Sequence, residues 1–124
     1  MSPPPLDYLE FDHSDDDEGH GSFDAMAAVD ERRLPALQAE IARVLAWAGE
    51  RFGAAAPLEE GGEWDCALGG TREVATPLAV HWDERAGTLD LRESGAGSPR
   101  VTLTLTLGGT AAFCDAFRAA FGVA

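Results

Sequence analysis

The sequence contains no lysine, and its nine arginines face 22 acidic residues, which gives a formal net charge of -13 at pH 7. Binding to DNA or RNA phosphate requires a basic surface, so we expect no nucleic-acid partner. Long apolar runs are also missing. None reaches the roughly 18 residues that span a bilayer, so we expect no membrane association. The first residues lack the basic start and apolar stretch of a signal peptide, which favours a cytoplasmic location.

Cysteine is scarce as well, with only Cys66 and Cys114, which lie 48 residues apart. Neither has a second cysteine or a histidine at metal-binding spacing, which excludes a zinc framework and a thioredoxin-like pair. Both stand in apolar patterns and are expected to be buried, reduced thiols. A disulfide would require their Cα atoms to approach within about 7 Å.

The local motifs of common enzymes are missing too. No GxSxG elbow, GxGxxG turn or GxxxxGK[ST] loop occurs. The glycine pair before Thr110 lies between an expected strand and an expected helix, where free N–H groups could bind an anion. A tight turn followed by a helix cap explains this pair better. We therefore expect no cofactor and no enzyme.

The sequence does contain enough apolar residues for one domain. Its 124 residues have a mass of 13.1 kDa and are 45% hydrophobic. A chain of this length buries enough surface to fold without disulfides or metals. We expect residues 1–5, which are rich in proline, to be disordered, and residues 6–124 to form a single α+β domain.

Two hydrophobic periodicities alternate along the chain. A period of two predicts six strands, at residues 6–12, 23–29, 63–68, 78–83, 89–91 and 101–107. Helical spacing predicts two amphipathic helices. The first begins after Asp30, its expected N-cap, or later near Pro35, and ends at Phe52 before Gly53. The second follows its cap Thr110 and ends before Gly122. The order ββαββββα predicts an α+β fold in which a mostly six-stranded antiparallel sheet carries both helices on one face.

The strand alternation also assigns side chains to the two faces of this sheet. Trp64, Leu78, Val80 and Trp82 are expected to face the core. The outward face is expected to carry Tyr8, Glu10, Asp12, Asp24, His81, Asp83, Asp90, Arg92, Thr102, Thr104 and Thr106. A histidine beside carboxylates can act as a general base, so an enzyme with His81 in a pocket between sheet and helices stays an alternative. A solvated polar face needs no such role.

The acidic charge is concentrated near the N-terminus. Residues 1–31 hold ten acidic side chains and no arginine, whereas residues 32–124 hold twelve acidic side chains and nine arginines. Asp15, Asp16, Asp17 and Glu18 are consecutive, in the loop expected over residues 13–20. A field of this sign favours a basic partner. These four residues are therefore the predicted partner-binding site.

His13 and His20 bracket the four carboxylates and are weak candidates for ligating a divalent metal. A calcium-binding loop with Gly19 at its sixth position would need a glutamate where Ala25 stands, so that motif is excluded. The favoured hypothesis is a small acidic binding or regulatory protein that contacts a basic protein through its N-terminal hairpin. The alternative is a domain that binds a small molecule or a divalent metal, on the concave sheet or at this loop.

Overall fold

The structure is a computed structural model that describes residues 5–123. Residues 1–4, which belong to the segment predicted to be disordered, lie outside the described residues. The element order confirms the predicted ββαββββα arrangement and the α+β class. The elements are β1 (Asp12–Asp15), β2 (Gly21–Asp30), α1 (Leu34–Phe52), the short helix η1 (Leu58–Glu60), β3 (Trp64–Ala75), β4 (Leu78–Asp83), β5 (Thr88–Glu93), β6 (Ser98–Gly109) and α2 (Ala111–Phe121).

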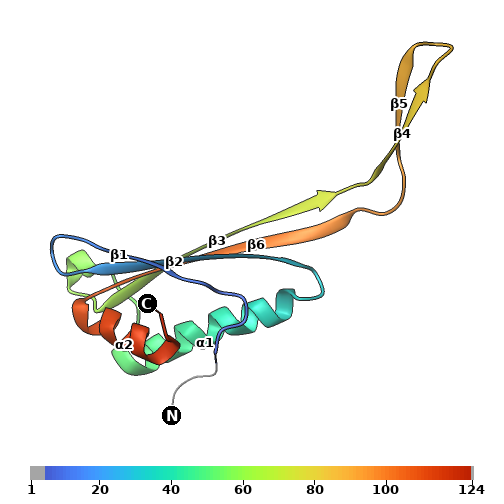
Figure 1. Cartoon of the computed structure of the whole chain (residues 1–124). Coiled ribbons are helices and arrows are strands. Elements are labelled where there is room, and N and C mark those ends of the chain that lie inside the picture. Colours follow the sequence, from blue (N-terminus) through green and yellow to red (C-terminus); the bar gives the residue numbers. More distant parts are fainter. Residues whose placement is uncertain (1–4, 124) are drawn as a thin grey trace.

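The predicted six-stranded sheet is wrong, because the strands form two separate sheets. Four strands form an antiparallel sheet in the order β1-β2-β6-β3, and within the described residues β4 pairs with β5 alone. The reason is the length of β3 and β6, which pair continuously from Trp64 opposite Gly109 to Ala75 opposite Ser98. This pair runs beyond the helices as a two-stranded ribbon, with the β4–β5 hairpin at its far end (Figure 1).

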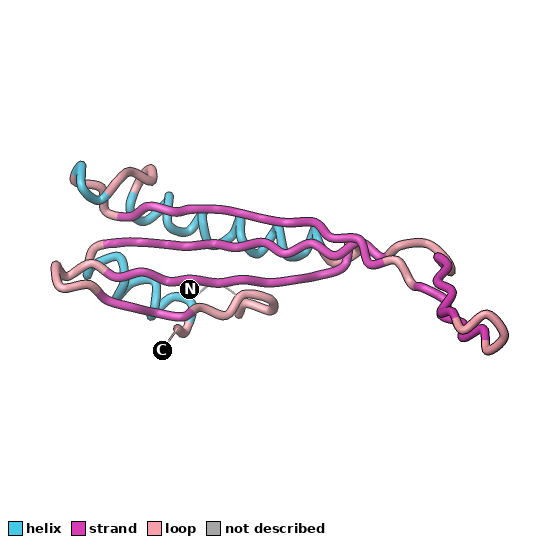
Figure 2. The backbone as a smooth tube through the Cα atoms, turned by 90° about the horizontal axis from the view of Figure 1, so that it is seen from above, coloured by secondary structure: helices cyan, strands magenta, loops and turns pink. Residues whose placement is uncertain are grey.

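Both helices lie under one face of the four-stranded sheet (Figure 1), α1 along β3 and β6 and α2 under β2 and β1 (Figure 2). The apolar stripe of α1 buries Leu37, Ile41, Val44 and Ala48. Across the layer, the core contains Phe23, Ala25, Ala27 and Val29 of β2, Leu105 and Leu107 of β6, and Phe113 and Phe117 of α2. The inward leucines and outward threonines predicted for the last strand are confirmed at its core end, where Leu105 and Leu107 are buried and Thr104 is exposed.

Two of the three tryptophans belong to this core. Trp64 is buried as predicted, its ring stacks on that of Phe113 at 5.9 Å, and its indole N–H donates to the Gly53 carbonyl at 2.8 Å. Trp47 is half-buried, with its ring centroid between 5.4 and 6.1 Å from those of Phe52, Phe113, Phe117 and Phe121. This position at the helix edge is a packing position.

The inward orientation predicted for Leu78, Val80 and Trp82 is wrong. These side chains are between 52% and 59% exposed, because β4 lies in the projecting hairpin and has no helix against it. Alternation correctly places the three on one face of the strand. Which surface covers that face depends on the strand's neighbours, and alternation carries no information about them.

The strand predicted over residues 6–12 is also wrong. Only Asp12 belongs to a strand, and the preceding segment is held by Glu40 of α1, which is 4% exposed. The Glu40 carboxylate accepts hydrogen bonds from the backbone N–H groups of Asp7, Tyr8 and Leu9. These donors are therefore turned toward a helix side chain and not toward a neighbouring strand.

Three of the four ends of α1 and α2 follow the predicted signals, whereas α1 starts later than its expected cap, Asp30. The Thr110 hydroxyl accepts from the Phe113 N–H at 3.3 Å and caps α2, and Gly122 follows its last residue with a φ of 66°. Asp30, expected to cap α1, acts one turn earlier. Its carboxylate accepts from the Arg33 N–H at 2.9 Å, and the helix begins at Leu34.

Candidate functional site

The consecutive acidic residues form a tight turn between β1 and β2. The loop expected over residues 13–20 is shorter than predicted, because β1 continues to Asp15 and pairs there with Gly21. Asp16 Oδ1 accepts hydrogen bonds from the backbone N–H groups of Glu18 at 2.8 Å and His20 at 2.9 Å. The turn is thus built around one carboxylate, and Asp15, Asp16, Asp17 and Glu18 are all exposed.

The backbone fixes the charge state of this turn. The hydrogen bonds from His20 and Glu18 lower the pKa of the Asp16 carboxyl below its ordinary value of 3.8. Backbone donors favour the ionised form because they bind a carboxylate more strongly than a neutral carboxyl group. Asp16 therefore stays negatively charged at neutral pH.

The fold brings a second acidic segment to the same end of the molecule. Leu58 of η1 lines a cavity of about 240 Å³ together with Asp16 and His20. The exposed carboxylates that η1 and the residue before β3 add at this end are Glu59, Glu60 and Glu63. Neither residues 12–24 nor residues 52–71 contain an arginine. We call these two segments, residues 15–18 and 59–63, the acidic end.

Sequence reasoning missed Glu59, Glu60 and Glu63, which lie about forty positions further along the chain. In the sequence, Glu59 and Glu60 fall between an expected helix and an expected strand, and Glu63 begins the strand expected over residues 63–68. The strand order β1-β2-β6-β3 places the start of β3 and the β1–β2 turn at one end of the sheet. Strand alternation does not specify that order, so no signal in the sequence could have joined the two segments.

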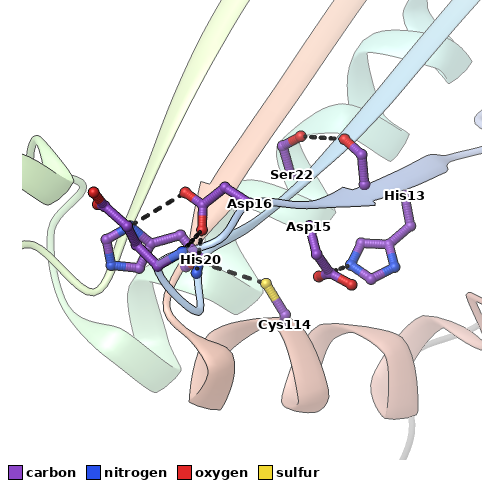
Figure 3. A network of polar contacts seen from close by, with 9 residues as sticks. His13, Asp15, Asp16, His20, Ser22 and Cys114 are labelled. Atoms are coloured by element: carbon purple, nitrogen blue, oxygen red, sulfur yellow. Dashed lines mark hydrogen bonds and ion pairs between the residues drawn. The ribbon is translucent and has the colours of Figure 1, made fainter.

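His13 and His20 lie apart, His13 on β1 and His20 in the turn (Figure 3). His13 Nε2 lies 3.0 Å from Asp15 Oδ1, and its ring stacks on Phe23 at 4.6 Å. His20 Nδ1 lies 3.8 Å from Asp16 Oδ2 on the side of the turn that faces η1. Within the described residues, the group that could hold a metal ion is Asp16, Glu18 and His20, whose ligand atoms lie within 4.8 Å of one another.

Cys114 lies beneath the turn, next to Gly21. A Cβ atom at Gly21 would come within 2.8 Å of Cys114 Sγ and 3.0 Å of Asp15 Oδ1, so only glycine fits without displacing them. Burial raises the pKa of the Cys114 thiol, and the carboxylates of Asp15 and Asp115 raise it further. The thiol therefore stays protonated at neutral pH, which is unsuitable for a nucleophile.

Both cysteines are free, and their burial partly follows the prediction. Cys114 is buried, whereas Cys66 is half-buried on β3. Burial, followed by the charge of Asp65, raises the pKa of the Cys66 thiol. Neither cysteine has the lowered pKa of a reactive thiol.

Of the residues predicted on the outward face, Tyr8 and Glu10 precede β1, and the others are divided between the two sheets. Asp12 lies opposite Asp24 in the register, and the Thr106 hydroxyl donates to Asp24 Oδ1 at 2.6 Å. His81 is exposed on the β4–β5 hairpin, opposite Asp90 and far from these carboxylates. The pocket between sheet and helices that the enzyme hypothesis required at His81 is therefore not formed.

The glycine pair before α2 has a structural role. The Thr110 hydroxyl caps the helix and donates to Glu63 Oε2 at 2.7 Å. This carboxylate is already present at the helix N-terminus, where an anion would otherwise be favoured. The turn-and-cap explanation accounts for the contacts made here.

Comparisons of the chain with protein-family models, with curated proteins and with solved structures found no match. Among the described residues, no helix combines the length and the apolar character needed to cross a membrane. Two surfaces of the molecule are unusual, one in its negative charge and the other in its exposed apolar side chains.

Proposed function

We propose that this protein is a small binding protein that contacts a basic partner protein through its acidic end. The observation that carries the proposal is the meeting of two acidic segments at one end of the sheet. Asp15, Asp16, Asp17 and Glu18 are joined there by Glu59, Glu60 and Glu63, and all seven are exposed. A regulatory or inhibitory protein that blocks a basic surface would need this distribution of charge.

The geometry supports binding in two further ways. Asp16 fixes the backbone of the turn through its hydrogen bonds to Glu18 and His20, so the carboxylates are presented on an ordered structure. A rigid acidic surface accelerates encounter with a basic one and selects against acidic competitors. The two free cysteines favour action in the reducing cytoplasm, where disulfides are rare.

The test compares two variants of equal charge. One replaces the turn carboxylates (D15N, D16N, D17N and E18Q), and its matched control replaces four carboxylates of the distal hairpin (D83N, E84Q, D90N and E93Q). Each bears four fewer negative charges than the parent chain. Proteins of the host lysate are captured at low salt on each chain and identified by mass spectrometry. We expect a basic protein to be retained by the parent and the hairpin variant and lost from the turn variant.

Salt provides the second readout, because screening weakens contacts between exposed charges. The captured protein should dissociate as the ionic strength rises from low to physiological values. Equal retention by the turn variant and the hairpin variant would contradict the proposal and would move the binding surface elsewhere. Retention of no protein by the parent chain would contradict it as well.

The grouping of Asp16, Glu18 and His20 favours a second candidate, divalent-metal binding at the turn. One nitrogen and two carboxylate oxygens are ligands that suit zinc. Titration with zinc chloride, followed by NMR, should move the ring signals of His20, whereas those of His81 on the hairpin serve as the internal control. Unchanged His20 signals at millimolar zinc would exclude this candidate.

A further inference from the structure

The end of the molecule opposite the acidic end carries an exposed apolar surface. We call residues 71–100, the outer part of the β3–β6 ribbon with the β4–β5 hairpin, the arm (Figure 1). None of its residues is buried. Its large apolar side chains on the hairpin are Leu78, Val80, Trp82, Leu89 and Leu91, each between 52% and 59% exposed.

These five side chains share one face of the hairpin. In the antiparallel register Val80 lies opposite Leu91 and Trp82 opposite Leu89, and directly opposed residues point to the same side. Glu93, opposite Leu78, lies at the end of this apolar face, and the other face carries the opposed pairs Ala79–Arg92 and His81–Asp90. The hairpin is thus amphipathic, yet within the described residues no element packs on its apolar side. A two-stranded hairpin is marginally stable in water, so this face needs a covering surface.

The body of the same molecule offers a complementary surface. A groove of about 500 Å³ lies between α1 and the outer strand β3, lined by Ile41 and Leu45 of the helix and Leu68 of the strand. Leu68 is 60% exposed. Gly69 and Gly70 follow it without side chains, and Leu103 of β6 lies so close to Gly70 that a Cβ there would come within 2.8 Å of it. The groove is therefore apolar, open and shallow enough to receive a flat sheet surface.

Charge does not oppose contact between two arms or between an arm and this groove. Residues 71–100 contain five acidic residues and four arginines, a net charge of -1, whereas residues 1–31 carry ten acidic residues and no arginine. The arm also points away from the acidic end (Figure 1). Two copies joined through their arms would keep their strongly charged ends apart.

The size of the hairpin face argues for a reciprocal contact. Six residues at about 3.3 Å each and two strands about 4.8 Å apart give a face of roughly 20 by 10 Å. One such face in one groove falls below the roughly 800 Å² that each partner buries in a stable interface. A two-fold arrangement doubles the contact to roughly 400 Å² of flat face per copy, because each hairpin enters the groove of the other chain, and this is the size of a weak, transient interface.

From these observations we infer that the protein forms a two-fold homodimer in which the apolar hairpin face of each copy covers the α1–β3 groove of the other. The occupant of both exposed surfaces is then a second copy of this chain. The inference does not depend on the proposed role of the acidic end. The variant neutralised at residues 15–18 should dimerise like the parent. Partner binding by the acidic end and homodimerisation can therefore be contradicted independently of each other.

The first test measures the mass of the full chain by sedimentation equilibrium up to about 100 µM. We expect a dimer. Val80→Asp places a charge on the apolar hairpin face, and Ala79→Asp, its neighbour on the polar face, is the matched control. Val80→Asp should weaken dimerisation at least about 30-fold, as expected for loss of one central interface side chain, whereas Ala79→Asp should leave it unchanged. A monomeric parent chain, or a Val80→Asp dimer of parental affinity, would overturn the inference.

Mixing distinguishes a hairpin-in-groove contact from two hairpins packed face to face. Leu68→Asp alters the groove and should also weaken dimerisation, although its exposed position leaves the core intact. A mixture of the Val80→Asp and Leu68→Asp chains retains one unaltered hairpin and one unaltered groove. It should therefore form heterodimers more readily than either variant alone forms homodimers. Failure of the mixture to associate better than the separate variants would rule out the reciprocal arrangement.

Discussion

Single residues hold this fold together at places where regular secondary structure does not. Glu40 is the clearest case, because its buried carboxylate binds three successive backbone N–H groups of the N-terminal segment. A carboxylate is the natural partner for several converging donors, since it accepts through both oxygens without bringing a donor of its own. Through Glu40 the segment before β1, including Leu9, is fixed against the helix layer and contributes to the core.

This residue makes a sharp prediction about stability. Glu40→Gln keeps the shape of the side chain but replaces one acceptor by an NH₂ donor directed at backbone donors, and it removes the charge that strengthens the remaining bonds. We expect the free energy of unfolding in urea to fall by about 2–3 kcal/mol. Glu50→Gln, at an exposed position of the same helix, should change it by less than about 0.5 kcal/mol. If the two substitutions lowered the free energy of unfolding equally, the hydrogen bonds of Glu40 would stabilise the fold no more than the contacts of an exposed carboxylate with water do.

At the scale of the element, the sequence was informative where local chemistry decides the structure. Helix α1 ends at Phe52 and α2 is capped by Thr110, as hydrophobic spacing and capping residues indicated. Strand alternation correctly placed Leu105 and Leu107 in the core. The physical reason is that helix caps and strand faces depend on neighbouring residues along the chain.

The errors concern relations between distant elements. Alternation over residues 6–12 was correct as a pattern, but Glu40, some thirty positions away, takes the hydrogen bonds that a strand would need. Trp82 was assigned to the core because nothing in its neighbourhood indicates that β4 leaves the sheet. For the same reason, the sequence does not indicate that Glu59 and Glu60 lie at the same end of the molecule as the acidic turn. Four residues of the site were visible in the sequence, and the strand order supplied the rest.

At the scale of the whole molecule, two different surfaces lie at opposite ends of the molecule (Figure 1). The acidic end is charged and polar, whereas the arm is nearly neutral and carries the exposed apolar face. The proposed dimer would therefore present two acidic ends on one particle. Such bivalence raises the apparent affinity for a partner with two basic surfaces, without any new contact at either site.

The separation of body and arm leads to a final prediction. None of the buried core residues belongs to residues 71–100, so the body should fold without the outer arm. Replacing residues 76–97 by Asn-Gly joins Ala75 to Ser98, which already face each other in the register, through the turn that two-residue hairpins prefer. We expect the shortened chain to retain the circular dichroism spectrum of a folded α+β protein. Its free energy of unfolding, measured at a concentration where the parent is monomeric, should lie within about 1 kcal/mol of the parent value.

The shortened chain should also stay monomeric at concentrations where the parent dimerises, and it should still bind any partner captured by the acidic end. An unfolded product would mean that the arm stabilises the body, and dimerisation of the shortened chain would place the contact between copies on another face.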